Sequence, residues 1–340
     1  MRALVTGGQG FLGLHLVRFL LGRGAAVRVL VRRPAPEVEA LGVDSIVGDL
    51  RDAATVRSAC RDRDVVFHVA AHVALWGPWE EFFSINVRGT ENVLAGCRAE
   101  GVPRLVYTST PSVVFDNTDQ EGLDESLPYP KAFLSPYPAS KALAEKAVLA
   151  AHGRDGLSTV ALRPHLIWGP DDPHIVGQLL KRARQGRLFL VGSGRNRVDV
   201  TYVDNCAEAH WRAAEALTPG SPLGGRAYFL SQGEPLPIEE FMRRVAGAAG
   251  LSPRLFRIPY PLAWGAGWLM EKFGGGESGV PLLTRFLAAE LAKSHFYNIA
   301  AAKKDFGYFP RVGTEEGFRR LAENLAAGGA PSARSEGTVR

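Results

Sequence analysis

The stretch Thr6-Gly7-Gly8-Gln9-Gly10-Phe11-Leu12-Gly13 decides the fold of this 340-residue chain. It follows a short apolar run at residues 2–6 and precedes a segment with helical periodicity at residues 11–22. Its glycines at positions 7, 10 and 13 allow a tight turn and let the backbone approach a pyrophosphate, whose charge then faces the helix N-terminus. The stretch therefore predicts a dinucleotide-binding turn between a first strand and a first helix.

Strands and helices alternate through the first half of the chain. Apolar runs predict further strands at residues 27–31, 64–71, 104–109 and 158–162. Helices are predicted at residues 85–100 and 137–151. The alternation indicates an α/β fold with a doubly wound, mostly parallel sheet of the Rossmann type. A glycine-rich turn also forms without a ligand, but its position at the first strand–helix junction favours cofactor binding.

The second half of the chain is less regular. After Gly169, loops rich in glycine and proline separate short strands from helices expected at residues 206–217, 238–249 and 282–293. We expect residues 1–169 to form the dinucleotide-binding domain. Residues 170–327 should form mainly a smaller, mixed substrate-binding domain, from which some segments return to the first core. Residues 328–340 are expected to be a flexible tail.

Residues 258–273 have an unusual composition, with two tryptophans, a Leu-Met pair and an aromatic end. This segment could be a lid over an apolar pocket, ordinary core, or a helix lying at a lipid interface. It is too short to cross a bilayer, and we favour lid or core over membrane contact.

The composition indicates a folded protein without a membrane span. Hydrophobic residues make up 46% of the chain, and no apolar run reaches 18 residues. The three cysteines Cys60, Cys97 and Cys206 show neither a CxxC pair nor zinc spacing, which fits a reducing compartment and no metal site. The N-terminus reads straight into the glycine loop and leaves no room for a signal peptide. We therefore predict a cytoplasmic protein, with contact to a membrane surface as the remaining alternative.

The net charge of +5 is mild, but basic residues gather in one region: Arg182, Arg184, Arg187, Arg195 and Arg197. A solvated helix and loop is the favoured interpretation. The alternatives are a docking surface for an acidic partner, such as another enzyme of the same pathway, and a rim that attracts an anionic substrate. Because no nucleic-acid recognition motif accompanies the charge, nucleic acid is excluded as a partner.

The end of the second predicted strand selects the cofactor. NAD-binding folds of this type usually place an Asp or Glu there, but this chain has Arg32 and Arg33 and no acid until Glu37. Arginine can bind a 2′-phosphate through two hydrogen bonds. The sequence therefore predicts NADP(H) rather than NAD(H). Asp49 and Leu50, after the third strand, are candidates to flank the adenine.

A second motif carries the chemistry. Tyr137 and Lys141 lie four residues apart, so they share one face of a helix, and Pro138 suits its first turn. A free phenol has a pKa near 10, which a nearby ammonium would lower. Tyr137 could then give a proton to a carbonyl oxygen as hydride arrives, or take one in the reverse direction. An ordinary helix could carry the same pair by chance, but here it shares a chain with the cofactor loop.

Hydroxyl side chains follow the strand at residues 104–109, at the edge where open α/β sheets bind ligands. Spacing alone does not choose among Ser109, Thr110 and Ser112 as the group that polarises the substrate oxygen.

Taken together, the motifs resemble those of a known family. They are the glycine loop, Asp49-Leu50, His68-Val69-Ala70-Ala71, Asn86-Val87-Arg88-Gly89-Thr90, Tyr107-Thr108-Ser109-Thr110, Tyr137-Pro138-Ala139-Ser140-Lys141 and Arg163-Pro164-His165-Leu166-Ile167-Trp168-Gly169. About residues 1–325 resemble extended short-chain dehydrogenases/reductases of the 3β-hydroxysteroid dehydrogenase-like branch. Within that branch, residues 107–115 and 304–308 are similar to bacterial 2-alkyl-3-oxoalkanoate reductases of long-chain olefin biosynthesis.

The resemblance implies roles for individual residues. Tyr137 would be the general acid/base and Lys141 its partner, with Thr110 as the third member and Ser112 the second choice for that position. The implied cofactor contacts are Gly7, Gly10, Phe11, Leu12, Gly13, Arg32, Arg33, Asp49, Leu50, Ala70, Ala71, Ser109, Tyr137, Lys141, Pro164 and Ile167.

Three further expectations follow from the resemblance. Asn86 would lie near the cofactor, and the helices at residues 85–100 and 137–151 would form a homodimer interface. His165 stands where the family often has a small or apolar residue, so it would either touch nicotinamide or substrate or be structural.

The sequence thus predicts an NADPH-dependent reductase that converts a 2-alkyl-3-oxoalkanoic acid, a lipid-like substrate, into the 3-hydroxy acid. The alternative is an NAD(P)-dependent 3β-hydroxysteroid or sterol dehydrogenase. A nucleotide sensor without catalysis is a third interpretation, but sensors can dispense with the Tyr137/Lys141 pair that this chain keeps.

Overall fold

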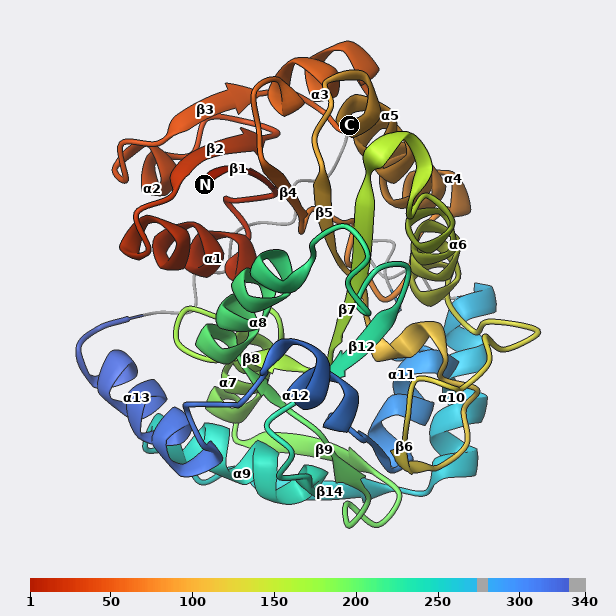
Figure 1. The fold of residues 1–340 in the computed structure, drawn as a ribbon. Coiled ribbons are helices and arrows are strands. Elements are labelled where there is room, and N and C mark those ends of the chain that lie inside the picture. The colour runs from red at the N-terminus through yellow and green to blue at the C-terminus, as the bar shows by residue number, and fades with distance from the viewer. Residues whose placement is uncertain (274–280, 330–340) are drawn as a thin grey trace.

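A seven-stranded parallel sheet lies at the centre of the computed structural model, which describes residues 1–273 and 281–329 (Figure 1). Its strand order is β12-β7-β5-β4-β1-β2-β3. The strands span Arg2–Thr6 (β1), Ala26–Val31 (β2), Asp44–Val47 (β3), Val65–His68 (β4), Arg104–Thr108 (β5), Ser158–Pro164 (β7) and Ala227–Leu230 (β12). All neighbours pair in parallel, which confirms the predicted doubly wound fold.

Two hydrophobic cores cover the two faces of this sheet. One packs α1 (Phe11–Gly22) and α8 (Val203–Ala216) against it, and the other packs α3 (Ala53–Cys60), α5 (Gly89–Ala99) and α6 (Pro136–Ala150). Within β4, Phe67 belongs to the first core and Val66 to the second. A parallel strand covered on both faces must be apolar at successive positions, which explains the composition of these runs.

The order of the strands reverses between β1 and β4. From β1 the chain moves to β2 and β3 on one side, then crosses to β4, β5 and β7 on the other. Loops after the strands on both sides of such a reversal meet at the carboxyl edge of the sheet and leave a crevice there. This edge carries the glycine loop and the hydroxyl-rich loop after β5, which are expected to face one ligand.

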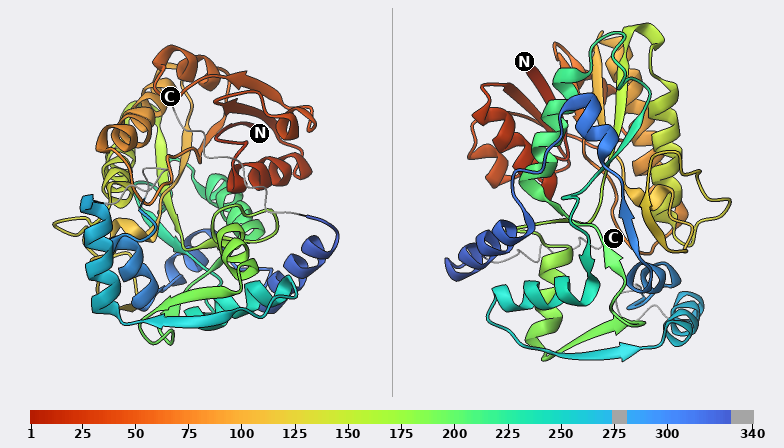
Figure 2. Two further views of the ribbon diagram at one scale, coloured as in Figure 1. Left: turned by 180° about the vertical axis from the view of Figure 1, so that it is seen from behind. Right: turned by 60° about the horizontal axis from the view of Figure 1, so that its bottom comes forward.

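Smaller sheets, built mainly by the second half of the chain, lie below the central one (Figure 2). Their strands are β6 (Gln120–Leu123), β8 (Ile167–Trp168), β9 (Arg187–Val191), β10 (Arg197–Val198), β11 (Thr201–Tyr202), β13 (Leu236–Pro237), β14 (Arg254–Ile258) and β15 (His295–Tyr297). The helices of this part are α7 (Ile175–Arg184), α9 (Ile238–Ala248), α10 (Tyr260–Phe273), α11 (Arg285–Ala292), α12 (Ala300–Phe306) and α13 (Thr314–Ala326). Short helical segments elsewhere are α2 (Pro36–Glu39), α4 (Trp79–Phe82), η1 (Phe83–Arg88), η2 (Pro111–Val113) and η3 (Arg154–Gly156).

The chain passes between the two parts in both directions. β12 and α8 come from the second half but pack with the central sheet, whereas β6 comes from the first half and pairs with β15. The two parts are therefore joined by shared sheets as well as by the connection after Gly169.

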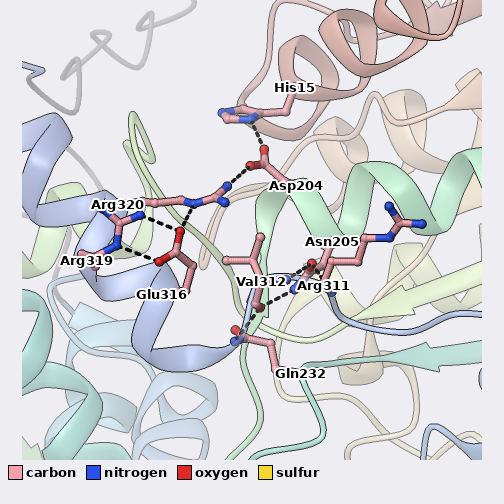
Figure 3. A network of polar contacts seen from close by, with 9 residues as sticks. All are labelled: His15, Asp204, Asn205, Gln232, Arg311, Val312, Glu316, Arg319 and Arg320. Atoms are coloured by element: carbon pink, nitrogen blue, oxygen red, sulfur yellow. Dashed lines mark hydrogen bonds and ion pairs between the residues drawn. The ribbon is translucent and has the colours of Figure 1, made fainter.

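A polar network ties α13 to the central part (Figure 3). Asp204 of α8 accepts from His15 of α1 at 3.0 Å and lies 3.5 Å from Arg320 of α13. Beside it, the buried amide of Asn205 bonds the backbone of Arg311 and Val312 at 2.8 to 3.0 Å. These contacts fix the connection that enters α13.

The segment at residues 258–273 forms the end of β14 and the helix α10. Gly267 lets α10 approach the chain before α11 closely, since a Cβ there would lie 2.8 Å from the backbone nitrogen of Arg285. On its other side α10 leaves Leu262 65%, Leu269 51% and Phe273 75% exposed. Among the described residues, no helix combines the length and apolarity that crossing a membrane requires. Most of the expected tail, residues 330–340, lies outside the described residues.

Candidate active site

The glycine loop forms the turn that the sequence predicts between β1 and α1. Gly7 has a φ of +71°, which side-chain-bearing residues rarely adopt, and a Cβ on Gly13 would collide with the Gly7 carbonyl oxygen. Gly10 caps α1 without a side-chain hydrogen bond, and the first turn of the helix holds no acidic residue. The positive end of α1 is thus left to a ligand, as a pyrophosphate site requires.

Residues from two other segments gather around this turn. Ala70 follows β4, donates its backbone N–H to Thr6 at 3.2 Å, and sits against Gly7. Leu12 forms a small buried cluster against which Phe11 and Ile167 of β8 pack. The structure therefore brings the glycine loop together with Ile167, which is remote from it in sequence.

Arg32 and Arg33 are exposed directly after β2. The pKa of Asp49 is lowered chiefly by its hydrogen bonds from Arg51 at 2.7 and 2.9 Å. The charge of Arg32 lowers it further. Asp49 is therefore already paired with an arginine, and Arg51 is a third basic side chain at this corner that the sequence reasoning missed. Leu50 is buried and packs against Gly89.

Tyr137 lies in the first turn of α6. Ser135 caps this helix by accepting from the Tyr137 N–H at 3.4 Å and donates to the Leu75 carbonyl at 3.2 Å. Burial raises the pKa of the Tyr137 phenol to about 12, while a hydrogen bond from Thr110 acts in the opposite direction and the charge of Glu290 adds to the rise. The expected lowering of this pKa is therefore wrong for this structure, because burial is the largest influence on the phenol.

Lys141 is buried beneath the hydroxyl-rich loop. Its Nζ donates to the Thr108 carbonyl at 2.6 Å and lies 4.1 Å from the ring centre of Tyr107. Burial lowers the pKa of Lys141 to about 7, with a smaller opposing effect from Glu145. Glu145 is itself paired with Arg163 at 2.6 Å. Lys141 is thus fixed at the end of β5, four residues after Tyr137 in the same helix.

Asn86 connects α6 with the loop after β4. It lies in the π-helical turn η1, accepts from the His72 N–H at 2.7 Å, and donates to the His72 carbonyl at 3.1 Å and to Ser140 at 2.9 Å. π-Helical turns are frequent at functional sites because they change the direction of a side chain. Here the turn aims Asn86 at the residue that precedes Lys141.

The three hydroxyls after β5 have different surroundings. Ser109 Oγ is buried and has no hydrogen-bond partner in the part of the chain that the structure describes. Thr110 lies close enough to the phenol of Tyr137 to lower its pKa, and its hydroxyl donates to Ser112 at 3.3 Å. Ser112 in turn donates to Glu290 of α11 at 3.5 Å. The unsatisfied Ser109 hydroxyl leaves room for a polar ligand group, and Thr110 stands next to Tyr137 as the resemblance implies.

His165 follows β7 and is buried. Its Nε2 lies 2.6 Å from Nδ1 of His295 in β15, and burial together with His295 lowers its pKa well below the ordinary value. His68 is also fully bonded inside the protein, through Thr6 at 2.8 Å and Thr90 at 2.9 Å. Sequence reasoning had missed His295 and Glu290, which approach the site from the second half of the chain.

Known proteins match this arrangement over nearly the whole chain. Residues 4–260 match the 3-beta hydroxysteroid dehydrogenase/isomerase family. The chain belongs to this family. Its members and relatives are NAD(P)-dependent oxidoreductases with the extended short-chain dehydrogenase/reductase fold, and so is this enzyme.

Relatives with named activities lie within and beside the family. A 2-alkyl-3-oxoalkanoate reductase of Stenotrophomonas maltophilia is 48% identical over 96% of this chain and all of its own. A 3-beta-hydroxysteroid dehydrogenase of Mycolicibacterium neoaurum is 37% identical over 93% of this chain and 88% of its own. Among solved structures, a UDP-glucose 4-epimerase of Thermus thermophilus in complex with NAD is 30% identical, with a TM-score of 0.74 over 96% of this chain and 99% of its own. The predicted family and the nicotinamide cofactor are therefore confirmed, whereas the choice between NADP and NAD stays a prediction.

Proposed function

We propose that this enzyme reduces the 3-oxo group of a 2-alkyl-3-oxoalkanoic acid to a hydroxyl with NADPH, as in bacterial olefin biosynthesis. The observation that carries the proposal is the 48% identity with a reductase of that name, over the full length of that relative. The site agrees with it. Phe115 and Phe286 form a buried apolar cluster next to Ser112 and Glu290, with Leu134 and Trp264 partly buried beside them. These apolar side chains would contact an alkyl chain bound beside Ser112.

Three residues of the chain have separate roles in the proposed reaction. Tyr137, which keeps its proton at neutral pH, donates it to the substrate oxygen, and the Thr110 hydroxyl holds that oxygen in place. Lys141 holds the loop after β5 through the Thr108 carbonyl. A bound nicotinamide cofactor would supply the hydride. The cofactor would be held by Gly7 to Gly13, Ala70, Ala71, Ser109, Pro164 and Ile167.

We further propose that the cofactor is NADP(H). Arg32 and Arg33 end β2 in exposed positions, and Arg51 lies at the same corner through Asp49. The one carboxylate among the residues that we assign to this end of the cofactor is Asp49, which is paired with Arg51. A 2′-phosphate at this corner would therefore meet positive charge.

A second candidate is a 3β-hydroxysteroid or sterol dehydrogenase. The 37% identity with a 3-beta-hydroxysteroid dehydrogenase supports it, and so does the family itself. The same Tyr137 would then accept a proton from the substrate hydroxyl. The identity is lower than for the oxoalkanoate reductase, which is why we rank the steroid second.

We also propose that the enzyme is a cytoplasmic homodimer, with α5 and α6 at the interface. On α6, Leu143 is 42% exposed while Glu145 and Val148 face inward. The proposal rests on the resemblance to the family, whose members often dimerise through these two helices.

One assay tests the substrate and the cofactor together. Purified enzyme is given a 2-alkyl-3-oxo acid with NADPH or NADH, or a 3β-hydroxysteroid with the oxidised cofactors, while the nicotinamide absorbance is followed. We expect reduction of the oxo acid with a lower KM for NADPH than for NADH. Turnover of the steroid alone would replace the first candidate by the second. A clear preference for NADH would contradict the role of Arg32 and Arg33.

A further inference from the structure

A row of polar side chains runs from Tyr137 in α6, through the hydroxyl-rich loop after β5, to α11. The Thr110 hydroxyl lies close enough to the phenol to lower its pKa, and it donates to Ser112 Oγ at 3.3 Å. Ser112 Oγ lies 3.5 Å from Oε1 of Glu290. The phenol, the two hydroxyls and the carboxyl follow one another along a single path. Each of these four groups can carry or accept an exchangeable proton.

The surroundings of Glu290 hold it in this position. Thr284 caps α11 by accepting from the Leu287 N–H at 3.1 Å, and Phe286 packs on Phe115 one turn before Glu290. On the far side, Nε2 of His295 bonds the Glu290 carbonyl at 2.7 Å and lies 3.7 Å from its Oε2. The carboxyl therefore points between His295 and Ser112.

Glu290 lies in surroundings that favour its protonated form, but it is not sealed from water. Burial raises its pKa, while His295 and Ser112 act in the opposite direction. The other titratable groups that feel its charge are Tyr137 and Tyr297. The side chain keeps 17% of its surface exposed, so water can reach it.

We propose that Glu290 resupplies Tyr137 with a proton after each reduction, acting through Ser112 and Thr110. This inference rests on the proposed reductase function. Once Tyr137 has given its proton to the substrate oxygen, the Glu290 O–H bond breaks and its proton passes to Ser112. Ser112 passes its own proton to Thr110, and Thr110 passes its own to the Tyr137 phenolate. One proton has then moved from Glu290 to Tyr137, and the Glu290 carboxylate regains a proton from water.

The separations of 3.3 and 3.5 Å are long for proton transfer. Catalytic hydrogen bonds are often long without substrate and shorten in the complex. The hydroxyls of Thr110 and Ser112 rotate freely enough to donate in either direction along the row.

Glu290→Gln tests the relay, because glutamine keeps the size and the hydrogen bond to Ser112 but has no acidic proton. The first turnover uses the proton already on Tyr137, so rapid mixing should show one nicotinamide oxidised per active site at the unmodified rate. Later turnovers should slow by about tenfold or more. Ser112→Ala should give the same burst, and the double variant should be no slower than either single variant.

Glu125→Gln is the matched control. Glu125 is a half-buried glutamate whose pKa burial also raises, but it bonds the Phe229 N–H away from Tyr137. It should show no burst. If Glu290→Gln slows the first and later turnovers equally, or leaves both unchanged, the relay is overturned. The comparison uses whichever oxo compound the unmodified enzyme reduces. If the proposed substrate class is wrong, the unmodified enzyme itself fails to reduce the 2-alkyl-3-oxo acid. If only the relay is wrong, the unmodified enzyme is active and the Glu290→Gln variant shows no burst.

Discussion

The network around α13 and the row from Tyr137 to Glu290 differ in how their groups are paired. In the first, Asp204, Arg320 and Glu316 are 35 to 44% exposed, and each contacts at least one opposite charge (Figure 3). In the second, hydroxyls and one carboxyl meet over 3.3 to 3.5 Å, and the four groups include neither an arginine nor a lysine. Paired charges near the surface fix one helix against another. Loosely bonded groups with shifted pKa values are more typical of a reacting centre.

Among these substitutions, Tyr137→Phe should have the largest effect on catalysis. It removes the transferable proton and little else, so kcat should fall by about 10³-fold while the dissociation constant of NADPH stays unchanged. Steady-state kinetics and cofactor fluorescence titration measure the two quantities. Turnover near that of the unmodified enzyme would show that another group donates the proton.

Lys141→Met should change how stability depends on pH. Folding lowers the pKa of Lys141 from 10.5 to about 7, so the folded state binds fewer protons than the unfolded state between these values. The free energy of unfolding of the unmodified enzyme should therefore rise with pH in this window relative to the variant, by up to about 1.4 kcal/mol per pH unit. Below about pH 7 Lys141 is charged in both states, so the full cost of burying its ammonium lowers the free energy of unfolding. Urea denaturation at several pH values measures the difference, and parallel curves for the two proteins would contradict the shift.

The smallest effects on catalysis are expected in the α13 network. Asn205→Ala leaves the buried backbone of Val312 without its partner and should lower the free energy of unfolding by about 2 kcal/mol. Arg320→Ala removes an exposed ion pair and should lower it by less than about 1 kcal/mol. Neither should alter kcat. A fall in kcat with unchanged stability would mean that the two networks are coupled.

The sequence was informative where function depends on short contiguous motifs. The glycine loop, the Tyr137 helix and the hydroxyl-rich loop each follow a strand, and parallel strands place all such loops at one edge. Glu290 was not predicted because 178 residues separate it from Ser112. Its one local signal is a lone acid in the otherwise apolar stretch from Phe286 to Ala292. The pKa of Tyr137 was mispredicted because spacing reports neighbours in a helix but not burial.

The position of β12 has a consequence for how the chain folds during synthesis. Because β12 pairs with β7 and covers its open edge, the central sheet is incomplete until residue 230 has left the ribosome. Until then β7 presents unpaired backbone groups, and the face that α8 covers is open until residue 216. A fragment ending at residue 169 would hold every motif assigned to the cofactor, yet it would keep an exposed strand edge that favours aggregation.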